Sequence, residues 1–83
     1  MSTYRVTCGG SAIGDRLPTF AAAKASLLSR AGAGLHAGRR TTEVAIERHG
    51  AERPVVVASA TLRGNDDWDA TEARIAAMAE CAS

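Results

Sequence analysis

Two β-prone runs on either side of a short turn constrain the fold of this chain more than any other feature. In the first run, residues 41–49 (TTEVAIERH), Val44 and Ile46 alternate with charged or small side chains. This period of two is typical of a strand with one buried face. A turn at residues 49–53 and the run VVVASATLR predict an antiparallel partner strand, with Pro54 at its start because proline cannot donate to the ladder.

The second strand of this hairpin carries apolar side chains on both faces. The face predicted to be buried consists of Val56, Ala58, Ala60 and Leu62. The other face consists of Val55, Val57, Ser59 and Thr61. We expect a partner, a dimer mate or an overhanging loop to cover Val55 and Val57.

A first helix is predicted in PTFAAAKASLLSRAG. Thr19 is a suitable N-cap, and Phe20, Leu27 and Leu28 share one helix face at spacings of seven and eight. Gly32 stands where a left-handed C-terminal cap is usual. Residues 32–40 (GAGLHAGRR) contain three glycines, Gly32 included, and are predicted to form the longest loop of the chain.

A second helix is predicted to open within residues 65–69 and to run to about Cys81. Asp69 and Glu72 have capping-box spacing, and the acidic residues around them complement the positive end of the helix dipole. Its apolar face is expected to hold Trp68, Ile75, Ala76, Ala79 and Ala82, with Met78 at the edge. We interpret Trp68 as a core anchor.

The N-terminal run YRVTC, residues 4–8, predicts a short strand before Gly9 and Gly10. Two readings of residues 9–17 stay open: Gly9-Gly10 turns the chain into a hairpin with a weak second strand at 11–17, or it only frees the chain to cross to the first helix. The predicted class is α+β, a two-layer sandwich in the order β-α-β-β-α, with both helices on one face of a small antiparallel sheet. Residues 1–83 form one domain.

The core of this domain is expected to be thin, because 18 of its hydrophobic residues are alanine. Neither a signal peptide nor a membrane span is visible, so we expect a cytoplasmic protein of a bacterial host cell. Cys8 and Cys81 lack metal or redox spacing and are interpreted as two thiols, with a long-range pair as the alternative.

The glycine-rich stretch CGGSAIG, residues 8–14, invites a phosphate-loop interpretation. Gly9 and Gly14 have the outer spacing of a dinucleotide fingerprint, but Ser11 occupies its middle position. The predicted helix also begins about five residues after Gly14, so its amides do not point into the loop. We therefore predict a structural turn and no cofactor.

Other chemistry is also disfavoured by the spacing of the candidate groups. An EF-hand beginning at Asn65 fails at Ala70 and Ala76, where glycine and glutamate are required, and His36 and His49 lack zinc-ligand neighbours. No catalytic signature surrounds Cys8 or either histidine. We predict no metal site and no enzymatic activity.

Charge divides the chain into opposite halves. Residues 1–42 hold six basic and one acidic side chain, whereas residues 43–83 hold four basic and eight acidic ones. The halves form a dipolar surface if the fold does not interleave them. Partner contacts are then expected from the basic side chains Lys24, Arg30, Arg39 and Arg40, or from the acidic ones, Asp66, Asp67 and Asp69.

In size and layout the chain resembles the anti-CRISPR inhibitors of phages and mobile elements, on the strand YRVTC, the helix FAAAKASLLSR and the hairpin TTEVAIERHGAERPVVVASATL. The resemblance implies a non-enzymatic monomer or small homodimer that binds a protein subunit of a type I (Cascade) effector complex and blocks target DNA. It carries over no functional residue. The alternative is a small nucleic-acid-binding or regulatory accessory protein that uses the basic patch.

Overall fold

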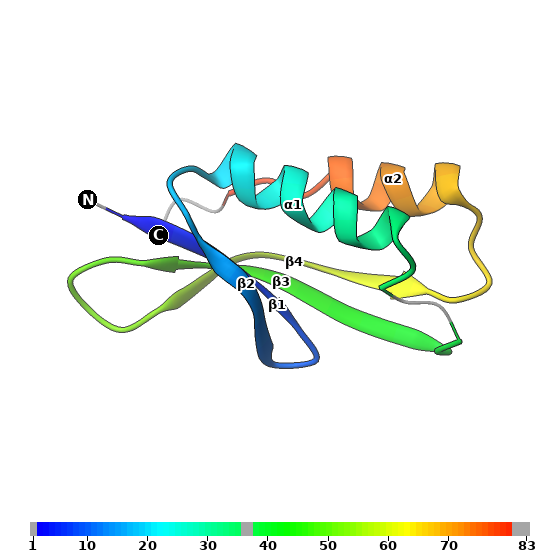
Figure 1. Ribbon diagram of the computed structural model, residues 1–83, viewed down its shortest axis with the longest axis horizontal. Helices are drawn as coiled ribbons and strands as arrows, with labels where there is room; N and C mark the ends of the chain where they lie inside the picture. Colours follow the sequence, from blue (N-terminus) through cyan, green and yellow to red (C-terminus); the bar gives the residue numbers. More distant parts are fainter. Residues whose placement is uncertain (1, 36–37, 81–83) are drawn as a thin grey trace.

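Two helices lie side by side on one face of a four-stranded antiparallel sheet (Figure 1). The structure is a computed structural model that describes residues 2–35 and 38–80. Its elements are β1 (Thr3–Cys8), β2 (Ser11–Leu17), α1 (Phe20–Gly32), β3 (Thr41–His49), β4 (Val55–Arg63) and α2 (Trp68–Ala76). The predicted α+β class with both helices on one face is confirmed, and strand β2 adds one element to the predicted order.

Strand β2 exists because Gly9 and Gly10 form a two-residue hairpin turn. Their φ angles of 60° and 87° suit the turn type that two-residue hairpins favour, and Cys8 pairs with Ser11 across it. The hairpin alternative for residues 9–17 is therefore correct. The sheet order is β2-β1-β3-β4, so two β-β-α units place their first strands, β1 and β3, side by side at the centre.

The core lies between the sheet and the helices. From the sheet, Val6, Val44, Ile46 and Leu62 are at most 2% exposed, and Val44 and Ile46 alternate as predicted. From the helices, the buried side chains are Ala23, Leu27, Ala31, Ile75 and Met78. Small alanines at the centre of α1 allow the helix to approach the sheet closely, and the core stays as thin as its composition predicts.

Strand β4 departs from the predicted alternation at a β-bulge. The register runs from Ile46 opposite Ala58 to Glu47 opposite Val56, which leaves Val57 as the extra residue. A bulge breaks the period of two, and Val57 and Ala58 are both buried whereas Val56 is 54% exposed. The prediction that Val56 faces the core and Val57 faces outwards is wrong.

The cap that ends α1 stands two residues later than predicted. Gly34, with φ of 96°, takes the left-handed position, while Gly32 is the last helical residue. The amides of Gly34 and Leu35 donate to the carbonyls of Ala31 and Arg30, which completes a Schellman motif. At the other end the prediction holds, because the Thr19 hydroxyl accepts from the Ala22 amide at 3.0 Å.

Helix α2 is shorter than predicted and has a different cap. The Ala70 amide donates to the Asp67 carboxylate at 2.8 Å, so Asp67 is the N-cap and the predicted Asp69–Glu72 capping box is wrong. The helix ends at Ala76. Its buried face consists of Thr71 and Ile75, followed by Met78 beyond the helix end; Ala76 and Ala79 are exposed, and Ala82 lies outside the described residues.

Among residues 2–35 and 38–80, three large apolar side chains remain exposed: Val55, Val56 and Trp68. Trp68 is 42% exposed, more than a core anchor should be, yet its ring lies against α1, where a Cβ on Gly32 would sit 3.4 Å from it. No helix of the described part of the chain is long and apolar enough to cross a membrane.

Candidate functional site

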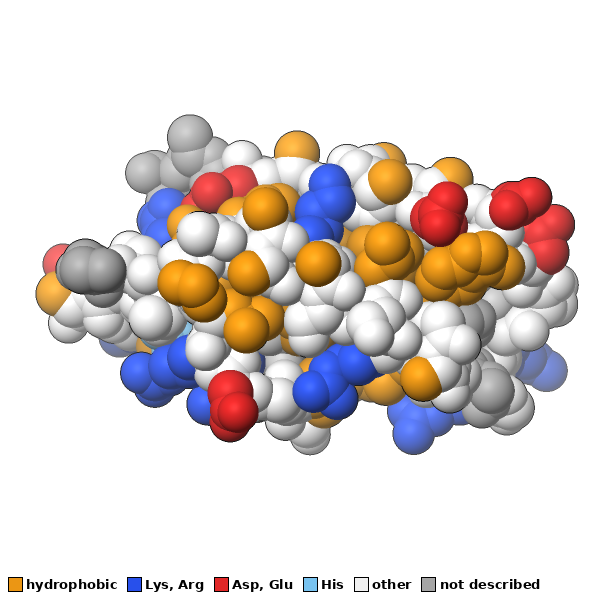
Figure 2. All heavy atoms as spheres, turned by 45° about the horizontal axis from the view of Figure 1, so that its top comes forward, with side chains coloured by type: hydrophobic (Ala, Val, Ile, Leu, Met, Phe, Trp, Pro, Cys, Tyr) orange, Lys and Arg blue, Asp and Glu red, His pale blue; other side chains and the backbone are white. Residues whose placement is uncertain are grey.

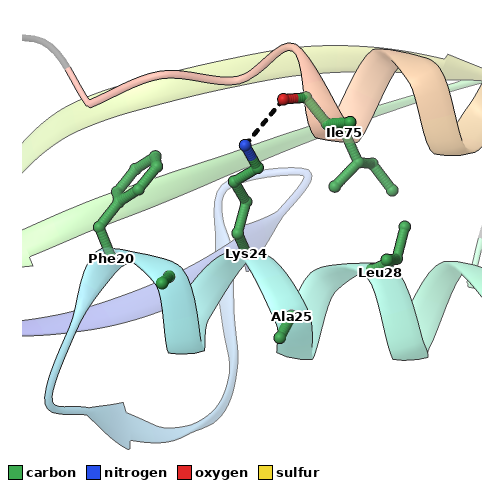
Figure 3. Close-up of a pocket in the computed structure, with 7 residues that line it drawn as sticks. Phe20, Lys24, Ala25, Leu28 and Ile75 are labelled. Carbon is green, nitrogen blue, oxygen red and sulfur yellow. Dashed lines mark hydrogen bonds between the residues drawn. The ribbon is translucent and has the colours of Figure 1, made fainter.

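A groove between α1 and α2 is the candidate binding site of this fold. It has a volume of about 340 Å³ and is open to solvent. Its lining consists of Phe20, Ala21, Lys24, Ala25 and Leu28 from α1 and Ile75 and Ala76 from α2 (Figure 3). All of these side chains except Lys24 are apolar, and the volume lies within the usual range for ligand sites.

The groove follows from the sequence of α1. Ala21 and Ala25 contribute only methyl groups to its lining, so a hollow stays open where larger side chains would fill it. Phe20 and Leu28, both half-buried, bound this hollow along α1. Hydrophobic side chains are spread over the helical layer in Figure 2. An open apolar surface of this kind favours contact with a partner.

Lys24 lines the groove, but its ammonium group is already engaged. The Nζ atom donates to the Ala76 carbonyl at 2.7 Å, as Figure 3 shows, and also to the Met78 carbonyl at 2.9 Å. These carbonyls lie at and just beyond the C-terminus of α2, where a cation complements the helix dipole. These two hydrogen bonds give Lys24 a structural role, and its contact with a partner stays a prediction.

The predicted basic patch is divided between separate places. Arg30 lies over strand β2, where a Cβ on Gly14 would clash with its guanidinium group. Arg39 and Arg40 instead line a hollow beside the end of β4. Strands β2 and β4 form opposite edges of the sheet, three strand spacings or about 14 Å apart. Arg39 and Arg40 therefore stay together, without Lys24 or Arg30.

The predicted acidic residues lie together at the beginning of α2, and two of them have structural partners. The Arg74 guanidinium donates to the Asp66 carboxylate at 3.0 Å, and Asp67 caps the helix. Asp69 is exposed in the first turn. Acidic side chains gather over this end of the helical layer at the right of Figure 2.

The two oppositely charged segments meet at one end of the molecule. The Gly64 amide donates to the Arg40 carbonyl at 3.2 Å, which joins the loop before β3 to the loop before α2. The halves of the chain are otherwise interleaved, because β1 from the first half pairs with β3 from the second. The condition for a dipolar surface formed by the two halves is not met.

Arg63 joins Arg39 and Arg40 in this hollow, together with Thr41, Gly64 and Asn65. Reasoning from the sequence missed Arg63, although the hairpin register holds the signal. Thr41 pairs with Arg63 across the β3–β4 ladder, so any arginine next to Thr41 lies near Arg63.

A second arrangement missed from the sequence fixes the segment after α2. The Tyr4 hydroxyl donates to the Glu80 carboxylate at 2.6 Å, and the Tyr4 ring packs edge-on against Phe20 with centroids 6.0 Å apart. The hydrogen bond to Glu80 raises the pKa of Tyr4 above its ordinary value of 10.0. Arg48 lies 3.7 Å from the same carboxylate.

The groups with reactive or ligating side chains are dispersed. Within residues 2–35 and 38–80, no three His, Cys, Asp or Glu side chains converge as a metal site would require. Cys8 is a half-buried free thiol, and His49 lies 3.3 Å from Glu47. His36 and Cys81 fall outside the described residues. Gly9 and Gly10 form the predicted structural turn.

Comparison with known proteins gives no relative: no protein-family model, curated protein or solved structure matches this chain.

Proposed function

We propose that this protein is a non-enzymatic binding protein that inhibits its partner by occlusion. The partner class is the one that the resemblance implies, a subunit of a type I CRISPR effector complex that is then unable to bind target DNA. The observation that carries the proposal is the apolar groove between α1 and α2. Grooves between helices are used in proteins to bind the apolar face of a partner helix.

The geometry of the groove supports an amphipathic helix as the proposed occupant. Phe20 and Leu28 bound the hollow eight residues apart along α1, which corresponds to about 12 Å of helix axis. This length suits about two turns of a partner helix with apolar side chains at i, i+3 and i+7. Two carbonyls at the end of α2 accept hydrogen bonds from Lys24, so two of its three donors are satisfied, and its positive charge stays at the side of the groove next to α2.

The alternative of a nucleic-acid-binding patch has less support. Two of its four expected residues, Lys24 and Arg30, point to other parts of the molecule. Electrostatic binding of a nucleic acid gains affinity from each phosphate that is contacted, so dispersal of the cations weakens it.

Inhibition of DNA binding tests the proposal, with two adjacent substitutions as a matched pair. Ala21 lines the groove and Ala22, about 100° further round the helix, does not. Glu at either position lies in the first turn of α1, where the helix dipole favours it. A purified type I effector complex is mixed with labelled target DNA and increasing amounts of each protein, and the mobility of the DNA is followed.

We expect the wild type and Ala22→Glu to suppress the shifted band at similar concentrations. Ala21→Glu should need roughly tenfold more protein, because it places a charge in an apolar contact. Circular dichroism controls for folding. Equal inhibition by the two variants would exclude the groove as the contact surface, and absence of inhibition by the wild type across type I complexes would refute the proposed function.

A further inference from the structure

A hollow of about 610 Å³ lies at the end of the β3–β4 ladder. Arg39 and Arg40 reach it from the loop before β3, and Arg63 reaches it from the last position of β4. The bond from the Gly64 amide to the Arg40 carbonyl holds the two loops together at 3.2 Å. Three arginine residues thus line one concave surface.

The three arginines of the hollow have no counter-charge among the residues that the structure describes. Within the described residues, Arg39, Arg40 and Arg63 have no ion pair or side-chain hydrogen bond, whereas Arg74 pairs with Asp66. Arginine remains protonated at any ordinary pH, and like charges held near one another repel each other. The arrangement therefore carries an electrostatic cost that a bound anion would remove.

We propose that this basic hollow binds the phosphate group of a small molecule. The planar forks of arginine match phosphate oxygens in bidentate geometry. Thr41 and Asn65 also line the hollow and add a hydroxyl and an amide, which donate to phosphate oxygens without adding charge. The hollow is large enough for one or two phosphates together with part of the molecule that carries them.

The neighbouring residues favour a small ligand over a nucleic acid. Asp66, Asp67 and Asp69 lie within four residues after Asn65, and acidic side chains gather at the upper right of Figure 2. Duplex DNA carries a negative charge about every 1.7 Å, so a chain entering the hollow would continue over these carboxylates. A single phosphate or pyrophosphate extends over fewer of these carboxylates and meets less of this repulsion. This inference does not depend on the groove between the helices.

Nuclear magnetic resonance with pyrophosphate tests the inference. Amide resonances of the ¹⁵N-labelled protein are followed while pyrophosphate, or sodium chloride at the same ionic strength, is added. We expect saturable shifts at Thr41, Gly64 and Asn65 with pyrophosphate alone. Arg63→Gln should weaken the affinity about tenfold, because one charged fork is lost. Arg53→Gln, in the exposed β3–β4 turn, is the matched control and should leave the affinity unchanged.

The same spectra show whether each variant is folded, so a negative result is interpretable. Shifts that do not saturate, or equal affinity in the two variants, would overturn the proposal. Tighter binding of a short duplex DNA through the same amides would also overturn it, in favour of a nucleic-acid surface. Ala21→Glu should bind pyrophosphate as the wild type does, which separates failure of this site from failure of the groove.

Discussion

Replacement of Lys24 by methionine should destabilise the fold through the loss of two charge-assisted hydrogen bonds. The Nζ atom holds the carbonyls of Ala76 and Met78 at 2.7 and 2.9 Å, and through them the end of α2 and the segment that follows. Methionine keeps most of the apolar stem of the side chain, so the packing against Phe20 and Leu28 is largely retained. The change then isolates the ammonium group.

The magnitude follows from the environment of each bond. A hydrogen bond to a charged group contributes about 1.5–3 kcal/mol, and a cation at a helix C-terminus contributes about 0.3–1 kcal/mol. Because one of the two bonds is exposed and screened by solvent, we expect a total loss of about 2 kcal/mol in the free energy of unfolding. For a domain of this size, this loss corresponds to a melting temperature lower by about 8–16 °C.

Urea denaturation followed by circular dichroism measures this loss. Arg53→Met, which also removes a cation but from the exposed β3–β4 turn, is the control and should change stability by less than about 0.5 kcal/mol. If Lys24→Met were no less stable than Arg53→Met, Lys24 would not have the structural role assigned to it, and its ammonium group would be available to a partner after all.

Three further changes test other contacts of the fold. Tyr4, the single tyrosine, should ionise above its ordinary pKa of 10.0 in a spectrophotometric titration, and Glu80→Gln should move the midpoint back towards that value. Because the pKa of Tyr4 is higher in the folded than in the unfolded protein, its contact with Glu80 stabilises the fold below the unfolded pKa. This stabilisation is lost as the pH rises through the folded pKa. An unchanged midpoint in Glu80→Gln would contradict the contact. Gly14→Ala should cost about 1–2 kcal/mol in urea denaturation, since its φ is 72° and the new methyl group meets Arg30, and Arg30→Ala should relieve part of that cost. Additive effects of these two changes would argue against the clash. Thr71→Val should raise the free energy of unfolding by about 1 kcal/mol, because the buried Thr71 hydroxyl has no hydrogen-bond partner, and a loss of stability would show that the hydroxyl is satisfied in solution.

Local signals predicted the fold where side-chain pattern and backbone preference agree. Val44 and Ile46 alternate in a strand that is buried on one face, and the Thr19 hydroxyl caps α1 as its position suggests. Strand β2 gave a weak signal for a physical reason. It lies at an edge of the sheet, where only Ile13 and Leu17 are half-buried, so little in its sequence is constrained by burial.

Tertiary contacts decided the features that local patterns missed. The alanines after residue 76 favour a longer α2, but hydrogen bonds from Lys24 to the Ala76 and Met78 carbonyls and from Tyr4 to Glu80 hold this segment outside the helix. The bulge at Val57 could not be predicted, because residues 55–57 are all valine and their sequence does not distinguish the extra residue from its neighbours.

The candidate site was equally hidden in the sequence. The groove forms because Ala21 and Ala25 carry no large side chains and because α2 packs beside α1. The second condition is a tertiary contact, which the sequence of α1 does not reveal. The basic hollow could be predicted only in part from the sequence. Arg39 and Arg40 stood out as a pair of neighbouring cations, whereas Arg63 joins them through the strand register alone.

Site-specific photo-crosslinking tests the proposed binding mode most directly. A benzophenone amino acid is introduced at Ala25, which lines the groove, or at Ala22, which lies on another side of α1, and each protein is irradiated with a type I effector complex. We expect a crosslink to one protein subunit from position 25 and only background from position 22. Equal crosslinking from both positions, or a crosslink from position 22 alone, would contradict the claim that the groove between α1 and α2 receives the partner.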